Sequence, residues 1–269
     1  MKLTREQMLA EMGITPVWRL REPAAAKPGM EMVAAEPETT ADEVAATAKG
    51  HVFPETAPVA VDALKWPELL ARISGCTACP LCTGRKQAVP GVGDLNPDWL
   101  FIGEGPGAEE DVKGEPFVGQ AGKLLDNMLA ALAIARGNKV YIANAVKCRP
   151  PGNRTPEPAE IATCAPYLKR QIALIQPRLI VLLGRAAAHA LLGDVGSLAS
   201  LRGQSFAYPA PAGSAYGIPV VVTYHPAYLL RTLPDKAKAW EDLCRARTLM
   251  RAAKTAAAES ASQPATRPT

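Results

Sequence analysis

The pattern of apolar and polar positions along this chain changes near residue 63. Beyond it, four short apolar runs have the length and composition of buried strands: Trp99–Ile102, Val140–Val146, Leu179–Leu183 and Val220–Thr223. Segments with helical spacing separate these runs, at 121–134, 157–175, 185–192 and 238–254. Strands that alternate with helices indicate a parallel sheet with helices on both faces. The pattern therefore predicts an α/β domain over residues 63–255.

The segments outside this domain differ from it in amino-acid composition. Residues 23–62 are rich in Ala, Pro, Glu and Thr, which predicts a disordered linker, because such a segment buries too little apolar surface to fold. Residues 1–22 contain apolar positions at helical spacing. They favour a short amphipathic helix, which is either a frayed tail or a motif that binds a protein partner. Residues 256–269 form a second low-complexity tail, which we expect to be disordered.

A glycine-rich loop follows the first predicted strand and reads GEGPGAEEDVKGEPFVGQAG over residues 103–122. Ordering so many glycines is unfavourable, and a loop of this length without a helix or strand pattern is usually functional or disordered. In parallel sheets, ligands bind beyond the carboxyl ends of the strands. Asn144 lies at the end of the second predicted strand and His225 follows the fourth. We therefore expect one crevice to gather these residues and the loop.

The composition narrows the class of protein. Lys and Arg outnumber Asp and Glu by 30 to 26, and the net charge of +4 permits nucleic-acid binding without establishing it. No stretch approaches the ~18 consecutive apolar residues of a membrane helix. The N-terminus carries charges where a signal peptide needs an apolar core. We expect a cytoplasmic monomer without membrane contacts.

The cysteines indicate a metal site. In a reducing compartment six cysteines suit metal binding, redox chemistry or burial better than disulfides. Cys76 and Cys79 form a CxxC pair, and Cys148 and Cys164 form a distant second group. A redox CxxC normally follows a strand, whereas this one precedes the first strand. Four thiolates suit either a zinc ion or an iron–sulfur cluster, and their spacing does not choose between the two.

The two remaining cysteines have simpler interpretations. Cys82 is either a spare thiol or an alternative ligand. Cys244 lies in an alanine-rich helical segment and is interpreted as a small buried apolar residue.

Four segments carry a family resemblance: GEGPGAEEDVKGEPFVGQAG (103–122), YIANAVKCRPPGNRTP (141–156), LLG (182–184) and HPAYLLR (225–231). Together with the four cysteines, in the same order, they resemble the family 4 uracil-DNA glycosylases of the uracil-DNA glycosylase superfamily. One glycine-rich loop alone would be weak support. The resemblance covers roughly residues 70–250, and the N-terminal extension and Cys82 depart from it.

The resemblance implies a fold and a cofactor. The fold is a three-layer αβα sandwich around a four-stranded parallel sheet. The cofactor is a structural 4Fe-4S cluster bound by Cys76, Cys79, Cys148 and Cys164, with zinc as the alternative occupant.

The resemblance also implies three roles in binding uracil, which must leave the DNA stack to be excised. Phe117 corresponds to the aromatic residue on which the base stacks. The Asn144 amide would donate to uracil O4 and accept from N3–H, a pair of hydrogen bonds that cytosine does not match. His225 would donate to uracil O2 and stabilise the departing anion. Taken singly, each has an ordinary structural interpretation, as a core aromatic, a strand-end amide or a structural imidazole.

The residue that positions the attacking water is harder to identify from the sequence than the residues that bind uracil. Another branch of the superfamily has an aspartate where this chain has Gly105. Glu104 and Asn153 are therefore our candidates for positioning the water, and Glu110 for narrowing the pocket against the thymine methyl group.

Four basic residues beside the motifs are predicted to contact DNA phosphates: Lys123, Arg149, Arg154 and Arg231. The leading hypothesis is a uracil-DNA glycosylase that hydrolyses the N-glycosidic bond of uracil in DNA and starts base excision repair. The alternatives are a non-catalytic DNA-binding member of the superfamily, acting as a repair or polymerase accessory protein, and a zinc-stabilised hydrolase of the same fold.

Overall fold

The computed structural model describes residues 61–193, 196–209 and 217–262, with side chains up to residue 255. The helix predicted within residues 1–22 and nearly all of the linker predicted at 23–62 lie outside these ranges. In the ranges that are described, no helix is both long and apolar enough to span a membrane.

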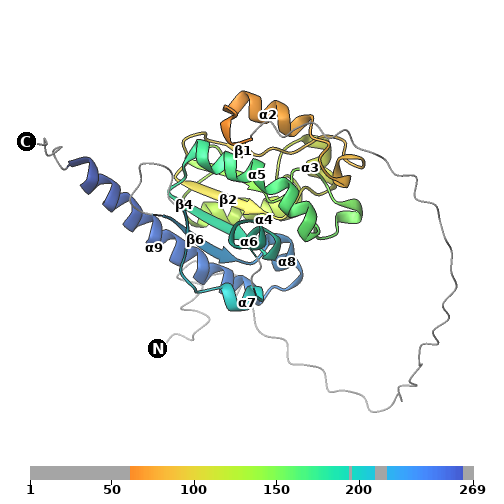
Figure 1. Ribbon diagram of the computed structural model, residues 1–269. Helices are drawn as coiled ribbons and strands as arrows, with labels where there is room; N and C mark the ends of the chain where they lie inside the picture. The colour runs from red at the N-terminus through yellow and green to blue at the C-terminus, as the bar shows by residue number, and fades with distance from the viewer. Residues whose placement is uncertain (1–60, 194–195, 210–216, 263–269) are drawn as a thin grey trace, which may run out of the picture. The chain divides into compact units, whose positions relative to one another are not determined.

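Six strands form one sheet in the order β1-β3-β2-β4-β6-β5 (Figure 1). They are β1 (Val92–Gly93), β2 (Trp99–Gly103), β3 (Val140–Asn144), β4 (Leu179–Leu183), β5 (Phe206–Tyr208) and β6 (Ile218–Thr223). The four predicted strands are the central ones and pair in parallel. The prediction of four strands was incomplete, because β1 and β5 pair antiparallel at the two edges of the sheet. Such short strands give no periodic pattern in a sequence.

Eight α-helices and three 3-10 helices surround the sheet in the described residues. The α-helices are α2 (Trp66–Ser74), α3 (Ala108–Lys113), α4 (Gln120–Ala131), α5 (Pro158–Ile175), α6 (Arg185–Leu192), α7 (Leu198–Leu201), α8 (Pro226–Arg231) and α9 (Asp235–Ser262). The 3-10 helices are η1 (Val61–Ala63), η2 (Pro80–Cys82) and η3 (Pro151–Asn153).

Alternate residues of the central strands face two separate apolar cores. In β2, Leu100 and Ile102 belong to one core, and Trp99 and Phe101 belong to the other. The first core also contains residues of α2, α5 and α6, and the second contains residues of α4, α8 and α9. A mostly parallel sheet buried on both faces confirms the predicted αβα arrangement.

The loop at 103–122 differs from the expectation because it contains α3. The Glu110 carboxylate accepts a hydrogen bond from the Gly107 N–H at 3.1 Å, at the start of this helix. Gly114 ends the helix with a φ of 77°, in the left-handed region that glycine favours. Since α3 has only six residues, capping groups rather than hydrophobic periodicity define it.

The C-terminal helix α9 is longer than the predicted segment 238–254. It begins at Asp235 and continues to Ser262. The added residues at its end are mostly alanine, serine and glutamate, of which alanine and glutamate are strong helix formers.

The carboxyl ends of the four parallel strands lie along one edge of the sheet. Gly103, at the end of β2, pairs with Asn144 at the end of β3. Leu183 and Thr223 pair at the ends of β4 and β6. The segments that follow these four strands therefore meet at this edge.

Candidate active site

A cleft of about 760 Å³ opens at the carboxyl edge of the sheet. Nine of the predicted site residues line it: Glu104, Gly105, Glu110, Phe117, Asn144, Asn153, Arg154, His225 and Arg231. They come from the segments that follow β2, β3 and β6, as the strand order requires. Lys123 and Arg149 are not part of the lining.

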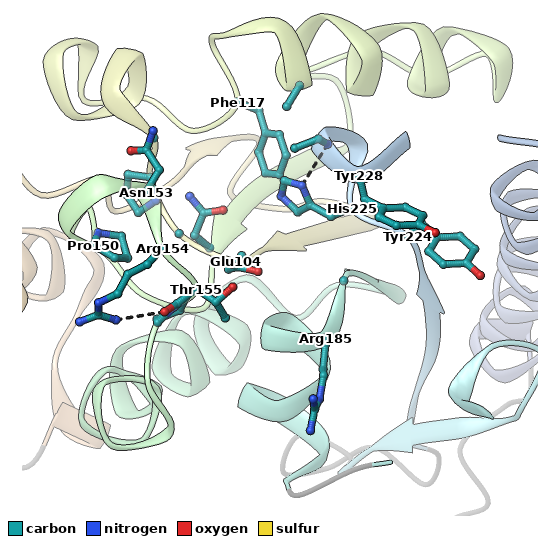
Figure 2. Close-up of a pocket in the computed structure, with 18 of the residues that line it drawn as sticks. Glu104, Phe117, Pro150, Asn153, Arg154, Thr155, Arg185, Tyr224, His225 and Tyr228 are labelled. Atoms are coloured by element: carbon teal, nitrogen blue, oxygen red, sulfur yellow. Dashed lines mark hydrogen bonds between the residues drawn. The ribbon is translucent and has the colours of Figure 1, made fainter. Parts of the chain in front are cut away.

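The rings of Phe117 and His225 stack in this cleft, with centroids 5.4 Å apart and 29° between their planes (Figure 2). The backbone of Phe117 has a φ of 57°, which bulky residues rarely adopt. A Cβ atom at Gly103 would lie 2.5 Å from the Phe117 ring, and one at Gly122 would collide with the Phe117 carbonyl group. Both positions therefore require glycine if the aromatic ring is to sit here.

Asn144 presents an unpaired acceptor in the same place. The residue is 2% exposed, and its Oδ1 atom has no hydrogen-bond partner in the part of the chain that the structure describes. A buried polar atom without a partner costs about 1–3 kcal/mol. Such an atom beside a cleft indicates that a bound ligand supplies the missing donor.

His225 is held as a neutral imidazole with a single donor. Its Nδ1 atom accepts a hydrogen bond from the Ala227 N–H at 3.1 Å (Figure 2), so the ring proton lies on Nε2. Burial lowers the pKa of His225 to about 4, the Arg231 charge acts in the same direction, and Glu110 opposes it. The ring is therefore uncharged near neutral pH, with Nε2–H as its donor.

Outside the lining of the cleft, the predicted cysteines lie near one another. Cys148 and Cys164 belong to the first apolar core, and Cys76 and Cys79 pack against it. All are free thiols. Burial raises the pKa of Cys79 and Cys148, and it raises the pKa of Cys164 to about 11. Cys76 and Cys82 also act electrostatically on Cys148. These thiols are neighbours, but no three ligand-type side chains among the described residues converge on one ion position.

Two cations accompany the thiols. Arg85 donates from Nη1 to the Cys148 sulfur at 2.8 Å and from Nη2 to the Ser74 carbonyl at 2.8 Å. Lys147 is buried, and its Nζ donates to the Asn144 carbonyl at 2.9 Å. Burial lowers the pKa of Lys147 to about 8, while the nearby Cys164 raises it.

Comparison with known protein families shows which family the chain belongs to. The family model of the Uracil DNA glycosylase superfamily matches residues 90–244, more than half of the chain. The chain belongs to this superfamily.

Individual relatives place this superfamily member among the type-4 proteins. The type-4 uracil-DNA glycosylase of Pyrobaculum aerophilum is 42% identical over 177 residues, which cover 64% of this chain and 87% of the relative. The type-4 enzyme of Thermotoga maritima is 43% identical over 183 residues, or 67% and 92%. A type-5 uracil-DNA glycosylase of Thermus thermophilus is 32% identical over 193 residues, or 58% and 85%.

In this type-4 family member, Glu104 follows β2 and is half-buried on the wall of the cleft. Burial raises the pKa of Glu104 above its ordinary value of 4.5, and a hydrogen bond with Thr155 partly opposes this. Gly105 packs closely, because a Cβ atom there would lie 2.8 Å from the Val146 side chain. Glu104 is thus a carboxylate beside the position where the other branch has its aspartate.

The Glu110 side chain connects two parts of the loop by hydrogen bonds. Its carboxylate accepts hydrogen bonds from the backbone N–H groups of Gly107, Val118 and Gly119, at 3.1, 3.0 and 3.2 Å. These contacts join the start of α3 to the residues that follow Phe117. Although Glu110 lines the cleft, its oxygens are already engaged by the backbone, and a contact with a substrate methyl group stays a prediction.

The polar residues after β3 are partly engaged with one another. Arg149 donates from Nε to Asn153 Oδ1 at 2.7 Å, and Asn153 has a φ of 56°. Arg154 forms a two-pronged ion pair with Glu160, with N–O distances of 2.9 and 2.6 Å. Arg231 is exposed and forms no ion pair within the described residues. Its guanidinium group is therefore available to bind a phosphate.

The lining also contains residues that the sequence analysis did not single out, among them two tyrosines and an arginine. Tyr224 and Tyr228 stack with centroids 5.0 Å apart, and the Tyr228 hydroxyl donates to Asp235 at 2.6 Å. Both flank His225 in YHPAY, so attention to the whole motif would have found them. Arg185 follows β4, and Figure 2 shows its side chain pointing away from Glu104 and His225.

Proposed function

We propose that this protein is a uracil-DNA glycosylase, which hydrolyses the N-glycosidic bond of uracil in DNA and leaves an abasic site. The buried, unpaired Asn144 Oδ1 beside the stacked Phe117 and His225 carries this proposal. The type-4 relatives, which bear the name of this activity, support it. The cleft of about 760 Å³ has room for a flipped nucleotide and part of its backbone.

Asn144 would distinguish uracil from cytosine by hydrogen bonding. Uracil N3–H would donate to Oδ1, and the amide N–H would donate to uracil O4. Cytosine has no N3–H and presents an amino donor at position 4, so both contacts fail. Each unmet buried hydrogen bond costs about 1–3 kcal/mol, which is sufficient to exclude the normal base.

His225 would stabilise the leaving group. As the glycosidic bond breaks, negative charge develops on uracil O2, and the Nε2–H of His225 is the donor that the α8 cap leaves open. The ring is held in place before the reaction by its contact with Ala227 and its stacking on Phe117. Stabilisation of the anion therefore supplies much of the catalysis.

The water that attacks the sugar would be positioned by Glu104, with Asn153 as a second contributor. The sequence places glycine at 105, so no carboxylate is available there. Glu104 is the half-buried carboxylate on the adjacent wall. Asn153 is more exposed, and its Oδ1 is engaged by Arg149.

Four cysteines would hold an iron–sulfur cluster: Cys76, Cys79, Cys148 and Cys164. The residues fit this group, because the thiols lie close enough together to act electrostatically on one another. Four cysteine thiolates are the usual ligand set of such a cluster. The Arg85 N–H that points at Cys148 suits a thiolate ligand. When bound, the cluster would cross-link distant segments, and it stands outside the cleft.

The proposal includes a cellular setting. The free thiols suit the reducing cytoplasm, and we propose a monomer that binds uracil-containing DNA there. Lys123, Arg149 and Arg231 would contact phosphates, so DNA binding should weaken with salt.

The test is a base-release assay on single-stranded and duplex DNA that contains uracil. We expect wild-type protein to release uracil, and His225→Ala to bind the DNA with wild-type affinity while losing most base release. A wild-type protein that binds DNA but releases no base would establish the non-catalytic alternative. Absorbance near ~400 nm with bound iron supports the cluster, whereas colourless protein with one equivalent of zinc refutes it.

A further inference from the structure

Arg136 binds the backbone on both sides of Phe117. It belongs to the turn between α4 and β3, and its Nη1 donates to the Pro116 carbonyl at 2.9 Å, while Nη2 donates to the Phe117 carbonyl at 2.5 Å. A longer contact of 3.5 Å joins Nη2 to the Gly122 carbonyl in the first turn of α4. The Asp126 carboxylate accepts from Nε, which fixes the direction of the guanidinium plane. One side chain therefore connects α4 to the segment that carries the proposed stacking ring.

The two carbonyl groups that Arg136 binds belong to the two peptide planes that meet at the Phe117 Cα atom. The φ of 57° at Phe117 sets the angle between these planes in the left-handed region, which is unfavourable for a bulky residue. A planar guanidinium group that binds both oxygens holds the planes in this relative orientation. The peptide after Phe117 is also held at its other end, because the Val118 N–H donates to Glu110 at 3.0 Å. Side chains from elsewhere in the chain thus stabilise this backbone conformation.

The direction of the Phe117 ring depends on this backbone, because the two peptide planes fix where the Cβ atom points. The residue is 6% exposed, and its ring stacks on His225 at a centroid distance of 5.4 Å (Figure 2). Arg136 is not among the described residues that line the cleft, so its effect on a bound base would pass through Phe117. We propose that Arg136 is a positioning residue that fixes the stacking face for uracil. This inference rests on the proposed function, in particular on the stacking role of Phe117.

Arg178 provides a matched control. It is also partly exposed and also donates from Nε to a carboxylate, that of Asp98, at 3.0 Å. Asp98 and Arg178 directly precede β2 and β4, so this ion pair lies at the amino edge of the sheet, opposite to the cleft. Removing either arginine eliminates an ion pair. Only the removal of Arg136 should disturb the ring on which the base stacks.

The experiment compares Arg136→Met and Arg178→Met in the full chain, at a temperature at which circular dichroism shows both to be folded. It measures kcat, KM for uracil-containing single-stranded DNA and inhibition by free uracil. We expect Arg136→Met to lower kcat at least tenfold and to weaken inhibition by uracil to a similar extent, because both depend on stacking of the base. KM should stay nearly unchanged, because phosphate contacts supply most of the affinity for DNA. Arg178→Met should keep wild-type kcat and uracil inhibition.

A double-mutant cycle tests whether the effect of Arg136 passes through the ring. Phe117→Ala removes the ring, so adding Arg136→Met to that variant should lower kcat little further. An arginine that only stabilises the fold would change kcat by the same factor in both backgrounds, and that result overturns the inference. Wild-type kcat and uracil inhibition in Arg136→Met, or an equal loss in Arg178→Met, also overturns it.

Two further variants complete the test. If Arg136→Met does not fold, Arg136→Lys, which keeps the charge but lacks the planar pair of donors, is judged by the same cycle. Phe117→Ala alone separates the underlying proposal. If it excises uracil normally, the stacking role of Phe117 fails and the inference fails with it. If it loses activity while Arg136→Met is normal, only the positioning role of Arg136 is refuted.

Discussion

At the scale of single residues, the cleft contains polar atoms that form no hydrogen bond, or only some of the hydrogen bonds they could form, within the protein. The Oδ1 atom of Asn144 is buried without a partner, and Nε2–H of His225 remains after Nδ1 has capped α8. Folding would ordinarily avoid an unpaired buried acceptor. Its presence beside an aromatic ring gives the pocket a directional preference for a planar ligand with a donor and an acceptor on its edges.

Changing Asn144 should change which base is read. Asn144→Ala removes both proposed hydrogen bonds, and at about 1–3 kcal/mol each, uracil excision should fall at least tenfold. Asn144→Asp offers only acceptors, which repel uracil O4 and accept from the cytosine amino group. Its ratio of cytosine to uracil release should therefore rise above that of Asn144→Ala. Base release from paired uracil and cytosine oligonucleotides measures this, and an unchanged ratio would contradict the assignment.

The pH dependence of excision should report Glu104 rather than His225. With its pKa lowered to about 4, His225 is already neutral throughout the range in which a histidine normally titrates. The pKa of Glu104 is raised, so as the pH falls this carboxylate is protonated first, and kcat should fall with it. Glu104→Gln should be slower and should lack this acidic limb. A limb near the ordinary histidine pKa that survives in Glu104→Gln would contradict the prediction.

At the scale of elements, short segments are shaped by close contacts that two glycines allow. Gly103 ends β2 where the Asn144 amide and the Phe117 ring converge, and Gly122 lets α4 approach the Phe117 backbone. Glu110 then joins α3 to the segment after Phe117 through three backbone N–H groups. These contacts therefore offset the conformational entropy that the glycine-rich loop loses when it is ordered beside the cleft.

Gly103→Ala should impair the pocket without unfolding the protein. The added Cβ atom would lie 2.5 Å from both Asn144 Oδ1 and the Phe117 ring, so one of the two side chains must move. We expect kcat to fall at least tenfold with a small change in Tm. Gly84→Ala is the control, because a Cβ atom there would meet nothing within 4 Å. Equal activities of the two variants would show that this close contact is unimportant.

At the scale of the whole molecule, the cysteine group joins three distant parts of the chain. Cys76 and Cys79 lie between α2 and η2, Cys148 follows β3, and Cys164 belongs to α5. A shared metal group would close two long loops, which stabilises the folded state by restricting the unfolded chain.

Loss of one ligand should therefore reduce both colour and stability. Cys164→Ala is expected to lose most bound iron and its absorbance, and to unfold at a lower temperature than the wild type. Cys244→Ala is the control, since Cys244 is half-buried in α9, away from the group. Iron analysis and thermal unfolding test this, and wild-type iron content in Cys164→Ala would remove Cys164 from the ligand set.

Much of the fold could be predicted from local pattern. The four central strands are continuous apolar runs because both of their faces are buried, and this burial is visible in the sequence. The gathering of Phe117, Asn144 and His225 followed from strand order, since the carboxyl ends of parallel strands share one edge. The spacing of the cysteines indicated a metal group without identifying it.

Other features depend on pairing between distant residues, which no local pattern records. The edge strands β1 and β5 exist because β3 and β6 offer them hydrogen bonds, and α3 exists because Glu110 caps it. The sequence by itself determined the layered fold, the edge that holds the cleft and the residues that reach it. Only the tertiary structure decided which of their polar atoms are already paired, because hydrogen bonds are set by three-dimensional neighbours.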